Sequence, residues 1–480
     1  MQVERPICHW GQAEFCRKSG LRGLEPIRKT ARGARRNVPT PSIVELPFSL
    51  SKLKIFSQSR PITAGVTERR AESRLTEIRR GLVIPFLLIM PIPQSIFRYA
   101  QAVRRRVHAH PELSAQEWHT ASYLQAELEA LGWSLVTIPD TPSFLAVWNP
   151  RGERFIGYRA ELDALPIAEA TDLPYASENA GIMHACGHDM HMAIAMGLAK
   201  MLAEGSAILP TGGDTTSYGV VLVFESSEEL LPGGAPAILS SSEFARYRPQ
   251  SIFAFHADPS LATGQIGFHP GPFMASCDEL YITVSGQGGH GAMPHLTTDP
   301  VLAAAHVVVA LQAVRARMLP PFTPSVLTIG RVEASGATNV IPHQVKMQGT
   351  FRTHDEEVRR QAHARIATVA ERVAESMGNT AQVEIRHGYP VLVNAPELCQ
   401  SVRQMLSAEC ENAECVEVPM RMTADDFAYY AQQIPGLYLR LGVGVGAGLH
   451  TSAFSPDEQA LGVALSALQV LCRHPELWGS

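Results

Sequence analysis

One stretch of the chain, MHACGHDMHMA at residues 183–193, is rich in side chains that bind metals. Cys186 and His188 stand two residues apart at the start of an expected helix, so a thiolate and an imidazole can face one site. A lone Cys-x-His pair is weak evidence, because a buried cysteine beside a helix-start histidine looks the same. Since His184 and His191 crowd the same turn, we predict a metal site here, with these two as supporting groups.

Two adjacent carboxylates follow an apolar strand in VVLVFESSEEL. Glu228 and Glu229 at the end of a strand would point to different neighbours. One can therefore bind a metal while the other takes a proton from water. Paired glutamates are also common in solvated loops, so this pair alone is weak evidence and indicates a site only together with the other clusters.

Three further polar side chains stand at similar places in the chain. His256 ends the apolar strand FAFHAD, where a satisfied core histidine is the simpler alternative. His450 lies in GAGLHTSAF, whose glycines allow the backbone to approach an ion closely. Asp163 in YRAELDALPI can hold a metal-bound imidazole through a hydrogen bond. Together the five clusters predict a metal centre.

The elements that must position these residues form an α/β pattern. From residue 96, two amphipathic helices are followed by short apolar strands that alternate with helices, which predicts a layered domain with a central mixed sheet. The pattern changes near residue 275, where alternating strands surround two helices. We expect the strands at 144–148, 155–158, 220–224, 252–256, 279–284, 325–331 and 345–352, near Val383 and near Leu437, and the helices at 190–202, 300–317, 356–377 and 457–473.

The smaller α+β unit is therefore expected inside the larger domain. We place the first part of the large domain at residues 94–274, the inserted domain at 275–379 and the second part of the large domain at 380–480. Residues 1–93 form a basic extension. Its composition predicts either a disordered segment or translation that truly starts at Met90, with a transit peptide and a nucleic-acid-binding arm as alternatives.

Charge and composition narrow the class of protein. The 480 residues carry a net charge of -5, but residues 1–90 hold 17 basic and 7 acidic side chains, which leaves 24 and 39 for the rest. An acidic body gives no general attraction to nucleic acid or to acidic membranes. The apolar run at 81–92 is shorter than the roughly 20 residues that span a bilayer. Eight widely spaced cysteines favour a reducing, cytoplasmic location.

Eight motifs in order resemble the aminoacylase and carboxypeptidase-like family of metal-dependent amidohydrolases. The branch that they resemble contains the hippurate hydrolases and the hydrolases of auxin (indole-3-acetic acid)-amino acid conjugates. The resemblance covers residues 96–475, and eight ordered matches are more specific than any single one. The motifs are HPELS, LDALPI, MHACGHDMH, EE, GGHGAMPH, TNVIP, DDFAYY and LHTSAF, starting at residues 110, 162, 183, 228, 288, 338, 425 and 449.

The resemblance implies two divalent metal ions per subunit, manganese or zinc. It makes Glu228 the general base, and it gives Asp163 the role of orienting a ligand. The ligands that it implies are Cys186, shared between the two ions, and His188, Glu229, His256 and His450.

The same resemblance makes the inserted domain a lid through which two subunits form a homodimer. His290 in GGHGAMPH would steady the oxyanion, reaching across the dimer into the partner's site. Asn339 and Arg352 would contact the carboxylate of the substrate. Ordinary polar residues of a turn and a strand are the alternative for these last two.

The reaction that follows is hydrolysis of the amide bond of an N-acyl amino acid. A dipeptidase or carboxypeptidase on the same scaffold is the nearest alternative. A non-catalytic metal-binding protein is disfavoured, because Glu228 binds no metal in this scheme and would have no purpose. The chain departs from the family pattern with ESS at 225–227, LLP at 230–232, Glu161 and Asp425. None of these changes removes an expected ligand, but the first two alter the pocket wall and so leave the substrate open.

Overall fold

The computed structural model describes residues 92–206, 217–474 and 477. The expectations for the basic extension, including a start at Met90, fall on residues outside this part of the chain, except for its last two positions. The apolar run at 81–92 lies outside it except for its final residue. These described residues belong to one compact unit, which extends from Pro85 to Ser480.

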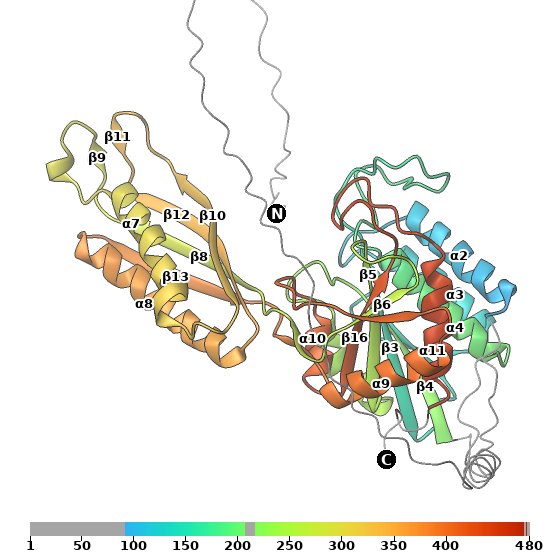
Figure 1. Ribbon diagram of the computed structural model, residues 1–480. Helices are drawn as coiled ribbons and strands as arrows, with labels where there is room; N and C mark the ends of the chain where they lie inside the picture. The colour runs from blue at the N-terminus through green and yellow to red at the C-terminus, as the bar shows by residue number, and fades with distance from the viewer. Residues whose placement is uncertain (1–91, 207–216, 475–476, 478–480) are drawn as a thin grey trace, which may run out of the picture. The chain divides into compact units, whose positions relative to one another are not determined.

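The larger of two main sheets is mixed and has eight strands (Figure 1). Its four central strands run parallel to one another, while β2 pairs antiparallel with β4, and β6 pairs antiparallel with β16. In spatial order the strands are β1 (Ser134–Thr137), β2 (Phe144–Trp148), β4 (Tyr218–Glu225), β3 (Arg154–Glu161), β5 (Ser251–Asp258), β16 (Gly436–Gly442), β6 (Gln265–Phe268) and β15 (Glu414–Glu417).

The central strands are apolar along their length because both faces of the sheet are covered. Every residue of β4, β5 and β16 is buried. Such continuous burial is typical of parallel strands between two layers of helices. The carboxyl ends of β3, β4, β5 and β16 meet at one edge of the sheet, which is where open α/β sheets bind ligands.

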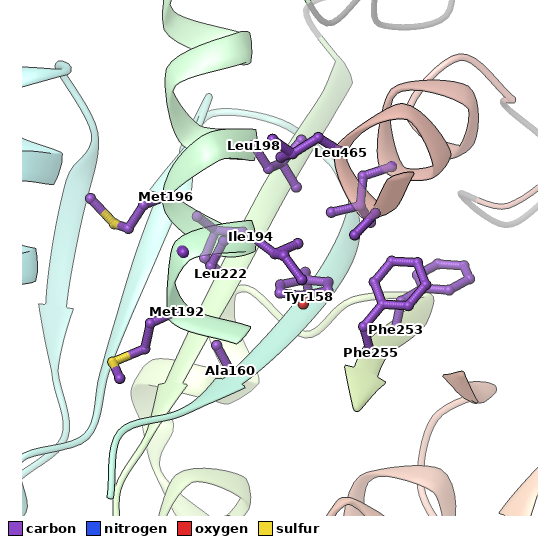
Figure 2. Packing of buried hydrophobic residues seen from close by; sticks show 14 of the residues in the cluster. Tyr158, Ala160, Met192, Ile194, Met196, Leu198, Leu222, Phe253, Phe255 and Leu465 are labelled. Carbon is purple, nitrogen blue, oxygen red and sulfur yellow. The ribbon is translucent and has the colours of Figure 1, made fainter. Parts of the chain in front are cut away.

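One face of the sheet packs against a cluster of long helices. The core there joins α4 to the side chains that alternate on the central strands, including Tyr158, Leu222 and Phe253 (Figure 2). The other face packs against short helices. The helices of the large domain are α2 (Gln94–Ala109), α3 (Trp118–Ala130), α4 (His188–Ala203), α5 (Ala235–Ser240), α6 (Ser242–Arg246), α9 (Pro396–Glu409), α10 (Phe427–Ala431) and α11 (Ala460–Leu471).

The second main sheet has four strands and its own core. Two helices, α7 (Pro300–Ala313) and α8 (Glu356–Ser376), pack side by side on it (Figure 1). Its strands are, in order, β10 (Ser325–Ala334), β12 (Gln344–Thr353), β8 (Asp278–Ser285) and β13 (Thr380–His387). Two short pairs accompany the main sheets, β9 (Gly289–His290) with β11 (Val340–Ile341) and β7 (Gly271–Met274) with β14 (Leu392–Asn394). The fold is therefore the expected layered α/β domain with an inserted α+β domain.

Strand β13 is the main departure from the expected order. The strand near Val383 was predicted to return to the large domain, but it pairs with β8 in the small sheet. Its residues alternate between exposed and half-buried positions, which is typical of an edge strand and differs from the buried strands of the large sheet. The small sheet thus continues to residue 387, eight residues beyond the predicted end of the inserted domain.

Helix α7 and the turn that follows it, Pro300–Met318, are long and apolar enough to cross a membrane by length and composition alone. In the structure one face of α7 packs in the core of the inserted domain, through Ala303, Val307 and Leu311. Core helices that pack on a sheet can have this length and composition, so we do not assign Pro300–Met318 as a membrane span.

Candidate metal centre

Five predicted ligands come together at the carboxyl edge of the large sheet. Cys186 precedes α4, and His188 is the first residue of that helix. Glu229 follows β4, His256 lies in β5, and His450 lies in the loop after β16. The sequence places them on four separate segments, and the parallel order of β4, β5 and β16 around β3 brings those segments to one place.

The ligand atoms form two groups that share one residue. Those of Cys186, His188 and His256 lie within 4.8 Å of one another, and so do those of Cys186, Glu229 and His450. The Sγ of Cys186 is 3.5 Å from Nε2 of His256 and 3.3 Å from Nε2 of His450. Nε2 of His450 is 3.1 Å from Oε1 of Glu229. The geometry therefore gives two candidate ligand groups that share Cys186.

The backbone around these ligands adopts special conformations. Gly187 between Cys186 and His188 has φ of 87°, and a Cβ there would lie 2.8 Å from the Cβ of Ala257. Only glycine fits, because it adopts the left-handed region without strain and leaves this space free. His450 itself has φ of 59°. A left-handed histidine is strained and is held in place by its surroundings, as is frequent at functional sites.

The histidine orientations fit metal binding. Nδ1 of His188 lies 2.9 Å from the backbone carbonyl of Asp163, and Nδ1 of His256 lies 2.9 Å from that of Ala257. Each carbonyl accepts a hydrogen bond from Nδ1, so each Nε2 is left with a lone pair. Nε2 of His188 is buried and has no hydrogen-bond partner among the described residues. A buried nitrogen of this kind is costly unless it binds an ion, so the donor set fits a cation.

The buried carboxylates at the site raise the pKa values of two candidate ligands. Burial raises the pKa of the Cys186 thiol well above its usual value, and the carboxylates of Glu229 and Glu228 raise it further. Burial opposes charge on His188 as well, but Glu161 and Asp163 outweigh it and raise the pKa of His188 to about 10. Without a cation, these effects favour a protonated thiol at Cys186 and a protonated imidazole at His188. A bound cation favours the opposite forms, because it stabilises a coordinating thiolate and a neutral imidazole.

The second glutamate of the pair stands beside the ligands. Oε2 of Glu228 is 3.8 Å from Nε2 of His188, and Glu228 is buried. Burial raises the pKa of Glu228 well above its usual range, and the carboxylate of Asp425 adds to the effect. A carboxylate with a high proton affinity, next to the ligands, is suited to accept and return a proton.

The two supporting histidines differ in their contacts. Nδ1 of His191 lies 2.7 Å from Oε2 of Glu161, and its Nε2 accepts a hydrogen bond from the backbone N–H of Ala257 at 3.0 Å. Both ring nitrogens are therefore occupied, as befits a supporting group. His184 is buried, and burial lowers its pKa to about 3, so it stays neutral.

A buried ion cluster behind the site was missed by the sequence analysis. Arg159 of β3 is fully buried and pairs with four carboxylates, which belong to Glu161, Glu225, Asp425 and Asp426. The only signal in the sequence was that three of these acids, Glu161, Glu225 and Asp425, stand where the family usually has other residues. Their shared partner Arg159 cannot be inferred from the sequence pattern. Tyr430 and Tyr438 donate hydrogen bonds to Glu225 and Asp425 at 2.9 and 2.7 Å.

The three site residues predicted in the inserted domain are His290, Asn339 and Arg352, and they lie on or beside β9, β11 and β12. The β9–β11 pair sets His290 opposite Val340, beside Asn339, whose carbonyl accepts from the N–H of Gly291 at 2.8 Å. His290 is exposed, and its Nδ1 accepts from the N–H of Ala292 at 3.1 Å, so Nε2 remains available as a donor. Arg352 of β12 instead donates to the carbonyl of Met422 at 3.2 Å.

A sheet that gathers thiol, imidazole and carboxylate groups at its strand ends, with a buried glutamate beside them, fits a metal-dependent hydrolase. Residues 157–473 match the model of peptidase family M20/M25/M40. The chain belongs to this family and is a hydrolase that acts on amide bonds.

Named relatives agree with this assignment. The chain is 35% identical to an N-acetyldiaminopimelate deacetylase of Brevibacillus brevis, over 76% of this chain and 94% of the relative. It is 33% identical to an N-acetyl-L-cysteine deacetylase of Bacillus subtilis, over 75% and 84%. A crystal structure of a dinuclear metal-binding M20 peptidase from Bacillus subtilis is similar with a TM-score of 0.68 and 31% identity, over 79% of this chain and 98% of that one.

Proposed function

We propose that this enzyme hydrolyses N-acyl amino acids at the amide bond with the help of two divalent cations. The observation that carries the proposal is the pair of ligand groups that share Cys186, next to Glu228. Deacetylation of N-acetyl amino acids, the activity named for the two curated relatives, is the same reaction with a small acyl group.

Cys186, His188, Glu229, His256 and His450 would hold the cations. A thiolate and imidazoles favour zinc, whereas manganese prefers carboxylates, so the mixed set is compatible with either. When bound, the cations supply Lewis acidity, which lowers the pKa of water at the site and polarises the scissile carbonyl.

The protein's own groups move the proton. Glu228 takes a proton from the attacking water, because its buried carboxylate lies 3.8 Å from Nε2 of His188, beside the proposed ligands. It returns the proton to the amine nitrogen as the amide bond breaks, so one residue serves as base and then as acid. Asp163 keeps His188 in the required tautomer and orientation.

We further propose that His290 donates its Nε2–H to the developing oxyanion and that Asn339 and Arg352 bind the carboxylate of the substrate. His290 is exposed within a single chain, which supports a role in the site of a partner subunit. Preorganised donors of this kind stabilise charge that appears only in the transition state.

A homodimer through the inserted domain is part of the proposal. The outer face of α7 exposes Val301, Leu302 and Val309, with 44, 49 and 73% of their surface accessible. Strand β10 is an edge of the small sheet and exposes Val332. An apolar helix face next to a sheet edge is suited to pairing with a second copy. The six cysteines that the structure describes are free, which supports a cytoplasmic location.

A hydrolysis panel tests the function. Protein reconstituted with zinc or manganese should release free amino acid from N-acetyl and N-benzoyl amino acids and act more slowly on the matched dipeptides. Faster hydrolysis of the dipeptides would instead assign a dipeptidase. No hydrolysis of either class by fully metal-loaded protein would contradict the proposal.

A further inference from the structure

Two links join the large domain to the inserted domain, and a hydrogen bond between their backbones connects them. The outward link runs from β7 to β8, and the return link runs from β13 to β14. The N–H of Cys277 in the outward link donates to the carbonyl of Tyr389 in the return link at 2.9 Å. Beside it, Arg359 of α8 donates to the carbonyl of Gly388 at 3.0 Å. The backbone of residues 388–389 is thus fastened to the inserted domain.

The side chain of Tyr389 reaches the catalytic glutamate. It is 6% exposed, and its hydroxyl donates a hydrogen bond to the backbone carbonyl of Glu228. Burial and the nearby Asp426 carboxylate raise the pKa of Tyr389 far above its usual value, so the phenol stays protonated and acts as a donor.

The same two segments also approach each other closely at Gly388. The loop that carries Glu228 continues to Leu231, and a Cβ placed on Gly388 would lie 3.0 Å from Cδ2 of Leu231. The loop also contains Ser227, with φ of 68°, which is a strained conformation for a residue other than glycine. Strained backbone persists only where its surroundings hold it. The N–H of Ser227 donates to Oε1 of Glu117 at 2.8 Å, and Tyr389 contacts the same loop one residue further on, at the carbonyl of Glu228.

We propose that Tyr389 is a positioning residue that sets the place of Glu228 through its hydroxyl and so ties the general base to the link between the two domains. This inference rests on the proposed function, since it takes Glu228 as the base. A general base works only within hydrogen-bond reach of the proton that it takes, and small displacements of catalytic groups lower the rate strongly.

The test compares two tyrosines that each lose one hydroxyl. Tyr429 is the matched control, because its hydroxyl donates to the carbonyl of Gly388 at 3.4 Å and its ring stands edge-on to Tyr389 at 6.3 Å. The hydroxyl of Tyr429 therefore contacts the return link and not Glu228. Metal-loaded Tyr389→Phe and Tyr429→Phe are compared with wild type for kcat, KM, metal content and amide hydrogen exchange over residues 226–234.

For Tyr389→Phe we expect kcat to fall roughly tenfold, as for the loss of one buried hydrogen bond, with KM and metal content unchanged. Amide exchange in the loop should become faster. Tyr429→Phe should match wild type. A Tyr389→Phe enzyme with kcat within twofold of wild type would overturn the inference, and so would an equal loss in Tyr429→Phe, since that would indicate general weakening of the link.

Two further variants keep the result decisive. If Tyr389→Phe fails to fold, Leu231→Ala loosens the close approach at Gly388 and should lower kcat in the same direction, and unchanged kcat would count against the tether. Glu228→Gln separates this inference from the proposed function. Full activity in Glu228→Gln would remove the base assignment itself, whereas an inactive Glu228→Gln with an unaffected Tyr389→Phe would remove only the positioning role.

Discussion

The carboxylate of Asp163 accepts a hydrogen bond from the backbone N–H of Glu229 at 3.0 Å. Its other oxygen lies 3.2 Å from Nδ1 of His188, so one side chain orients two of the proposed ligands. The hydroxyl of Ser114 donates to the same carboxylate at 2.7 Å. Asp163 therefore links both halves of the metal centre without lying in either ligand group.

Asp163→Asn should weaken metal binding by about 10–100-fold, the usual effect of removing a carboxylate that orients a ligand histidine. Competition with a chelator measures the affinity. Ser114→Ala is the control, because it keeps the carboxylate and should change the affinity far less. An unchanged affinity in Asp163→Asn would remove the orienting role.

His290→Ala should lower kcat by about 10²–10³-fold while both metals stay bound, as when an oxyanion donor is lost. His295→Ala is the matched control, since His295 is an exposed histidine five residues further along the same loop. Steady-state kinetics and metal analysis check both variants. A normal kcat in His290→Ala would rule out the oxyanion role.

Subunit mixing tests whether His290 acts across the dimer. His290→Ala and Glu228→Gln should each be inactive, but exchange of subunits creates one site with both residues intact. Partial recovery of activity is expected. If verified heterodimers stay inactive, His290 does not serve the partner's site.

Val309→Glu should shift the protein from dimer to monomer, because it buries a charge in the proposed apolar contact. Sedimentation velocity measures the mass. Gln312→Glu, which changes an exposed polar residue on the same helix, should leave the dimer intact. Wild-type protein that sediments as a monomer would contradict the proposed interface.

Glu117 should make stability depend on pH. Burial and the charge of Asp163 raise its pKa from 4.5 to about 7. Because the folded state binds this proton more tightly, the stabilising effect is present below pH 4.5 and is lost as pH rises through 7. Between pH 4.5 and 8, the free energy of unfolding of metal-free wild type should fall by about 3 kcal/mol relative to that of Glu117→Gln.

Urea unfolding at the two pH values measures this difference. Glu129→Gln is the control, because Glu129 is exposed on α3, the helix that begins directly after Glu117, and the variant should track wild type at both pH values. An equal gap between wild type and Glu117→Gln at both values would mean that Glu117 has an ordinary pKa in the folded protein.

Residues at strand ends could be predicted from the sequence, since apolar runs such as the one before His256 mark buried strands and the polar residue that ends them stands out. The Arg159 cluster could not, because its partners Asp425 and Asp426 lie more than 260 residues away and meet it only when β3, β4 and β16 are paired. The hydroxyl contact of Tyr389 with a backbone carbonyl leaves no pattern at all in the chain.

The edges of the small sheet were harder to place for a related reason. Strand β13 is half-exposed, so its side chains carry a weak alternation that fits either domain. Its pairing with β8, over a hundred residues earlier, decides its domain, and pairing partners are set by tertiary contacts rather than by local pattern.

The most direct test of the central claim is to measure metal content and turnover together in Glu228→Gln. The amide keeps the size of the side chain but cannot accept the proton of water at neutral pH. We predict that Glu228→Gln binds both cations as wild type does and hydrolyses N-acetyl amino acids about 10²–10⁴-fold more slowly. A fully metal-loaded Glu228→Gln that keeps more than roughly a tenth of the wild-type kcat would contradict the assignment of Glu228 as the general base.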